Sequence, residues 1–104
     1  MMPKVALFVR LEAKPGKEAD VVRFLENGLA LARQETATPI WFALRLSPSS
    51  FGIFDAFHDE AGRKLHLSGP IAQALMAAAP ELLSQPPTIE PIDVLGLKNT
   101  LQPS

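Results

Sequence analysis

The chain has 104 residues, no cysteine and a formal net charge of −1 at pH 7. It is long enough for one domain with a single core, and without cysteine it has no disulfide, thiolate metal ligand or cysteine nucleophile. The balanced charge argues against a nucleic-acid partner, and no apolar run is long enough to span a membrane. Because the charged N-terminal segment also lacks the pattern of a signal peptide, we expect a cytoplasmic protein.

The first half of the chain predicts three strands and one helix. Apolar residues alternate over residues 4–13, as they do in a strand with two distinct faces. After a Lys14-Pro15-Gly16 turn, the apolar spacing predicts a helix from residue 18 to about residue 34. Two further strands, over residues 40–46 and 51–57, are joined by a Ser-Pro-Ser-Ser connection typical of a hairpin.

The next segment predicts two helical pieces. Asp59 follows the third strand and can cap a short helix that ends near His66. Ser68-Gly69-Pro70 indicates a second helix start, with proline in the first turn. The following helix, over residues 70–79, is expected to be interrupted by Pro80, after which Glu81-Leu82-Leu83 could form one more turn.

A last strand over residues 88–98, in which Pro91 marks an edge or an irregularity, completes the order β-α-β-β-α-β. This order predicts an α+β ferredoxin-like fold, with helices on one face of a four-stranded antiparallel sheet. We expect residues 1–98 to form one domain and residues 99–104 to form a loose tail. Because the other sheet face is equally apolar, we expect a second copy to cover it in a homodimer.

Each predicted strand carries a charged residue among apolar ones, and the four considered together are Arg10, Arg45, Asp55 and Asp93. Asp55 stands where water is scarce, so an ionised carboxylate there needs a partner. The four residues could neutralise one another in an ion network, inside the sheet or across the dimer. They could instead form a ligand site in which an arginine holds an acidic or phenolic oxygen.

His66 is a candidate general acid or base, because its charge changes near neutral pH and it lies at a helix junction. The alternative is a helix-end histidine that a backbone carbonyl satisfies. His58 lies between a strand and a helix cap, where solvent exposure is expected. The two histidines lack the spacing of a helical metal pair, so we expect no metal site.

Trp41 could stack on a planar ligand, although a strand tryptophan is more often part of a core or interface. Asn27 could donate to a substrate carbonyl, or it could be exposed. Gly28 lies in the middle of the first helix, which favours a close approach of another element or a ligand.

Three segments resemble the antibiotic biosynthesis monooxygenase family: VALFVRLEAKPGKEADV, FGIFDAFHDEAGRKLHLSGPIAQALM and APELLSQPPTIEPIDVLGLK. The most specific likeness is an aromatic strand end, an acidic helix start and a histidine before a helix of small residues, matched by Phe57, Asp59 and His66. The resemblance implies a dimeric α/β barrel. It also implies an oxygenase that uses no cofactor and oxidises phenols or quinols with dioxygen, while other members degrade haem or have non-oxidative roles.

On this basis we expect a small aromatic phenol or quinol to bind between the helices and the sheet. His66 would take or share its phenolic proton, with neither metal nor flavin. The chain has no tyrosine, so no phenol side chain can take part. The residues expected to bind the substrate are Phe8, Asn27, Trp41, Arg45, Phe54, Asp55 and Leu75.

Two alternatives remain open at this point. The protein could be a non-catalytic dimer that binds a small hydrophobic or acidic metabolite, with Arg10 or Arg45 as the anchor. It could also bind haem, with His66 as an axial ligand.

Overall fold

The computed structural model describes residues 2–100. The four strands and three helices follow one another in the predicted order, with the second helical region divided in two. They are β1 (Val5–Glu12), α1 (Glu18–Ala32), β2 (Ile40–Arg45), β3 (Ser50–Phe57), α2 (Glu60–Leu67), α3 (Pro70–Leu82) and β4 (Thr88–Asp93). None of the helices in this part of the chain has the length and apolarity needed to cross a membrane.

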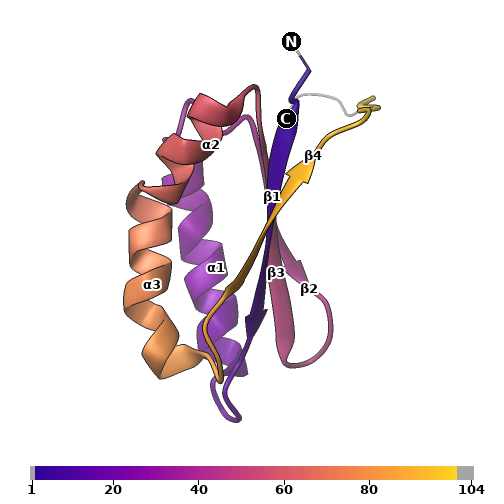
Figure 1. Cartoon of the computed structure of the whole chain (residues 1–104). Coiled ribbons are helices and arrows are strands. Elements are labelled where there is room, and N and C mark those ends of the chain that lie inside the picture. Colours follow the sequence, from indigo (N-terminus) through magenta and orange to yellow (C-terminus); the bar gives the residue numbers. More distant parts are fainter. Residues whose placement is uncertain (1, 101–104) are drawn as a thin grey trace.

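The strands form one antiparallel sheet in the order β2-β3-β1-β4, and all three helices lie on one side of it (Figure 1). The central pair, β3 and β1, is flanked by β2 on one edge and by β4 on the other. This is the predicted ferredoxin-like fold.

Alternation along the strands fills the layer between sheet and helices. On β3, Phe51 and Ile53 point to the helices and are almost completely buried. They pack in one core with the helix-facing residues of β1 and with the apolar stripes of α1 and α3. The core contains Val9, Leu11, Ala13, Val21, Leu25, Phe51, Ile53, Leu75, Ala79 and Leu83.

The opposite side of the sheet, which we call the outer face, carries a row of three aromatic residues. Phe42, Phe54 and Phe8 are cross-strand neighbours on β2, β3 and β1. The Phe42 and Phe54 rings lie 6.4 Å apart, and Phe42 is 51% exposed. No element among residues 2–100 covers this face (Figure 1).

Two predicted element ends are wrong. Helix α3 continues through Pro80 to Leu82, because a proline in the last turn costs only one backbone hydrogen bond. The carbonyl of Pro80 accepts a hydrogen bond from Lys14 Nζ at 2.6 Å, which supports this helix end. Strand β4 ends at Asp93 instead of residue 98; Pro91 lies on this edge strand, as predicted. Residues 101–104 of the predicted tail lie outside the described residues.

The predicted cap of α2 is confirmed. Asp59 has extended backbone angles, and its carboxylate accepts a hydrogen bond from the Gly62 N–H at 2.9 Å. We expect Asp59→Ala to lower the free energy of unfolding by about 1 kcal/mol, because one helix N–H loses its partner. Urea denaturation would measure this loss. Asp59→Asn is the control, since asparagine caps equally well, and an equal loss in that variant would contradict the capping role.

Candidate functional site

The most deeply buried charged side chain is Asp55, which is 0% exposed. It lies on the helix-facing side of β3, where alternation with Phe54 and Ala56 places it. Its Oδ2 lies 2.8 Å from Nε2 of His66, which comes from the last turn of α2 and is 7% exposed. His66 is therefore the charged partner of Asp55 Oδ2, whereas Asp55 Oδ1 is buried without a hydrogen-bond partner among residues 2–100.

The other nitrogen of His66 also faces a carboxylate. Its Nδ1 lies 2.7 Å from Oε1 of Glu35, in the connection between α1 and β2. The same Glu35 oxygen accepts a hydrogen bond from the Thr38 hydroxyl at 3.0 Å. We call Asp55, His66 and Glu35 the His66 cluster; it ties β3, α2 and the α1–β2 connection together.

The surroundings of His66 favour its charged form. Burial alone would lower its pKa, but the hydrogen bonds and negative charges of Asp55 and Glu35 outweigh burial and raise the pKa above its ordinary value. An imidazolium donates from both nitrogens, so it matches two carboxylate partners. In this state His66 cannot accept a further proton.

His66 and Glu35 also line a cavity of about 240 Å³. Its walls come from the α1–β2 connection and from the junction of α2 and α3, where Gly69 and Pro70 begin α3. Drug-sized sites have roughly 300–1,000 Å³, so this cavity suits a ligand of one or two rings. Glu35 Oε2 is buried and has no hydrogen-bond partner among residues 2–100.

Trp41 lies beside the buried end of the cluster. It is the cross-strand neighbour of Asp55, on the same face of the sheet. Its ring contacts α1 at Gly28, where an added Cβ would lie 3.6 Å from the indole, so the predicted close approach is to Trp41. The Trp41 Nε1 is buried and without a hydrogen-bond partner in the described chain.

The predicted aromatic pocket is not formed. Trp41 and Leu75 lie between the sheet and the helices, whereas Phe8 and Phe54 lie on the outer face. The sheet itself separates the two pairs, because side chains on adjacent strand positions point to opposite faces. These four residues therefore cannot surround one ligand within one chain.

Two other predicted ligand contacts lie apart from the His66 cluster. Arg45 lies over the Phe51 ring at 5.1 Å and donates to the Pro48 carbonyl at 2.8 Å. Asn27 is exposed and lines a separate hollow of about 140 Å³ between α1 and α3. Neither residue borders the cavity of Glu35 and His66.

The four strand charges do not form the ion network considered above. Arg10 lies on the outer face, 4.0 Å from Glu12, while Asp55 points to the helices. Asp93 raises the pKa of Arg63, although Glu60 is the main cause of that shift. Each charge has found a different partner, because the strand register places them on different faces and edges.

Several functional features were not predicted from the sequence. Glu35 follows the C-terminal end of α1, where the helix dipole disfavours an acid, and this position was a signal that it has a cationic partner. Arg63 is half-buried and donates to the backbone carbonyls of Ala6 at 3.1 Å and Ile92 at 3.4 Å. His58, predicted to be exposed, is half-buried.

Within residues 2–100, no group of three histidine or carboxylate side chains is arranged to hold a metal ion. In the His66 cluster the imidazole stands between the two carboxylates, so the three side chains bind one another.

Comparison with known proteins places the chain among solved structures. No protein-family model matches it, and no curated protein does. A crystal structure of a protein of unknown function from Nitrosomonas europaea is 57% identical, with 97% of this chain and 98% of that chain covered and a TM-score of 0.92.

More distant structures share the fold. A "putative antibiotic biosynthesis monooxygenase" from Nitrosomonas europaea is 12% identical, with a TM-score of 0.79 and coverage of 88% of this chain and 99% of that chain. A protein of the same description from Caulobacter crescentus is 16% identical, with a TM-score of 0.77 and coverage of 90% and 92%. The chain therefore belongs to one family with the 57% identical Nitrosomonas europaea protein, and its fold is that of the antibiotic biosynthesis monooxygenase type.

Proposed function

We propose that the protein is an oxygenase that oxidises a small phenol or quinol with dioxygen and without metal or flavin. The observation that carries this proposal is a buried imidazole between two carboxylates at the wall of a cavity sized for one or two rings. Such a cluster can hold and move a proton beside a bound aromatic molecule. The fold shared with proteins described as "putative antibiotic biosynthesis monooxygenase" supports the same reaction class.

The geometry suggests a different proton acceptor from the one expected. The surroundings of His66 favour its charged form and engage both of its nitrogens, whereas Glu35 Oε2 is buried and has no partner in the described chain. In the proposed reaction Glu35 takes the phenolic proton, and the positive charge of His66 stabilises the phenolate. Asp55 holds His66 in its charged form.

The oxidation then needs no reactant other than the substrate and dioxygen. The phenolate passes one electron to dioxygen, and the radical pair combines to form a carbon–oxygen bond. The resulting peroxide anion takes back the proton held by Glu35, and the hydroperoxide then loses water, so the product gains one oxygen atom and loses two hydrogen atoms. The protein's part is to bind and deprotonate the substrate and to exclude water.

A non-catalytic binding protein is the second candidate. The observation that favours it is the double engagement of His66, since a cluster satisfied at both nitrogens also serves as a structural element. Haem binding is less favoured, because axial ligation by His66 would break the contact between one of its ring nitrogens and a carboxylate.

We further propose that two copies associate through their outer faces. The row of Phe8, Phe42 and Phe54 is apolar, and no element of the described chain covers it. A face that is the same on both copies allows closed twofold association. Burying it would place the aromatic rows of the two chains in one interface.

Oxygen uptake with product mass tests the oxygenase proposal, using a panel of naphthols, catechols and quinols. We expect His66→Ala to reduce turnover by about 100-fold or more, the usual effect of removing a group that stabilises a developing negative charge. Activity of the unchanged protein should fall as the pH rises through the raised pKa of His66. His58→Ala is the control, since His58 does not line this cavity. Unchanged turnover in His66→Ala would refute the mechanism.

A further inference from the structure

The two carboxylate oxygens of Glu35, which lines the cavity with His66, differ in their hydrogen-bond partners. Glu35 Oε1 receives two donors, from His66 Nδ1 and from the Thr38 hydroxyl. Glu35 Oε2 receives none from residues 2–100, although it is buried. A carboxylate accepts through both oxygens, so Oε2 needs a donor that the described chain does not supply.

The net charge of the His66 cluster also favours a hydrogen-bond donor over an anion. With His66 protonated, the two carboxylates and one imidazolium sum to one negative charge. Glu35 and His66 are the ionisable side chains among the residues that line the cavity. The positive charge of His66 is enclosed by its two partners, whereas Glu35, which lines the cavity, keeps a buried oxygen with no partner among residues 2–100.

The partly positive N-terminal end of α3 does not make this cavity a site for anions. Helix α3 begins at Pro70 with no side-chain cap, and its N-terminal end is partly positive. Glu35 Oε2 lies close to this end, because a Cβ on Gly69 would lie 3.6 Å from it. An anionic ligand at this end would therefore be repelled by the Glu35 carboxylate.

We propose that this cavity recognises a one- or two-ring ligand through a hydrogen-bond donor on the ligand, a hydroxyl or an ammonium, and that it rejects ligands whose polar group is an anion. This inference rests on the proposed function for the location of the site, and it narrows the ligand class. It excludes the acidic metabolite considered for the non-catalytic alternative from this cavity.

Calorimetric titration with three single-ring probes tests the inference near neutral pH. Benzylamine carries an ammonium, benzyl alcohol a neutral donor and benzoate an anion on the same ring. We expect the first two to bind, and benzoate to bind at least about 10-fold more weakly than benzylamine, because it meets Glu35 with like charge. Benzoate affinity within about threefold of benzylamine, or no binding of any probe, would overturn the inference.

A charge-matched pair of variants shows whether Glu35 causes the preference. Glu35→Gln removes the negative charge and should reduce the benzylamine-to-benzoate ratio to about threefold or less. Glu81→Gln makes the same charge change near the opposite end of α3, which is roughly 20 Å long, and should keep the ratio. A preference that survives Glu35→Gln would contradict the inference.

The outcome is separable from that of the oxygenase proposal. Selective binding without oxygen uptake from any phenol would uphold the ligand class and remove the oxygenase function. Oxygen uptake with equal affinity for all three probes would do the reverse.

Discussion

His66→Ala is expected to lower the free energy of unfolding by about 3–5 kcal/mol, the usual cost of removing one partner from a buried ion pair. The variant leaves Asp55 with no exposed surface and no imidazole, so its charge loses both water and its partner. Domains of this size have about 5–15 kcal/mol in total, so the effect is a large part of the stability. Guanidinium denaturation at neutral pH measures it.

Two controls separate the charge effect from simple loss of packing. His58→Ala removes the other histidine, which has no ion pair of this kind, and should cost about 1 kcal/mol or less. Asp55→Asn combined with His66→Ala should cost less than the sum of the two single variants, because the buried charge is absent. Additive costs would contradict the buried ion pair.

The same cluster sets the direction of a pH dependence. The pKa of His66 is raised in the folded protein, so the folded state binds its proton more tightly than the unfolded state. The resulting stability is complete below the ordinary pKa of 6.5 and is lost as the pH rises through the raised value. The stability difference between the wild-type protein and His66→Ala should therefore shrink as the pH rises above 6.5.

Phe42→Asp is expected to convert the proposed dimer into monomers. The unchanged protein should sediment at twice 11.3 kDa, and the variant at one chain mass. Loss of a central aromatic contact and burial of a charge should weaken association by about 100-fold or more. Because Phe42 is 51% exposed in the single chain, the fold should tolerate the change.

Leu65→Asp is the matched control for this experiment. Leu65 is 64% exposed and lies on α2, on the other side of the sheet from the outer face. This variant should keep the dimer mass. Sedimentation of the unchanged protein as a single chain would refute the dimer, and dissociation of the Leu65 variant would show that the outer face is not the interface.

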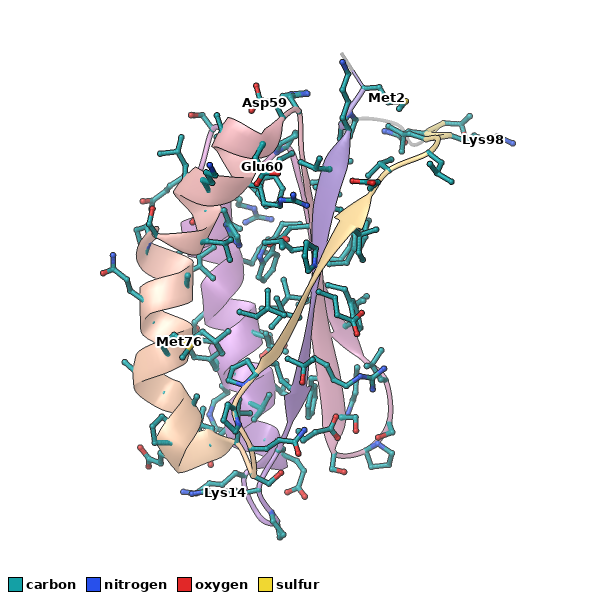
Figure 2. All side chains as sticks on the ribbon, viewed as in Figure 1. Met2, Lys14, Asp59, Glu60, Met76 and Lys98 are labelled. Carbon is teal, nitrogen blue, oxygen red and sulfur yellow. The ribbon has the colours of Figure 1, made fainter. Side chains whose placement is uncertain are left out.

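The fold could be predicted because its signals are local. The period-two alternation in β1 and β3 and the Asp59 cap depend on neighbouring residues, and both are confirmed. The interruption at Pro80 was predicted wrongly, because backbone and side-chain donors of Lys14 reach the end of α3 from a distant turn. Figure 2 shows Lys14 at this end of the molecule, opposite Asp59 and Glu60.

Only part of the candidate site could be predicted from the sequence. The environments of Asp55 and His66 were visible in the sequence, but their pairing depends on how α2 lies over β3. Glu35 is 31 positions from His66, and only the tertiary structure brings them together. Phe8 and Phe54 were placed in the wrong layer, because strand alternation gives two faces without saying which one the helices cover.

The proline on β4 limits how copies of this protein can join. The N–H of Val94 donates to the Lys4 carbonyl on the β1 side, so with a period of two the nitrogen of Pro91 faces the open edge. That edge lacks a donor in its middle, and an added strand could not form an unbroken hydrogen-bond ladder there. The sheet is thereby protected from sideways growth into ribbons at β4, and association is directed to its broad side.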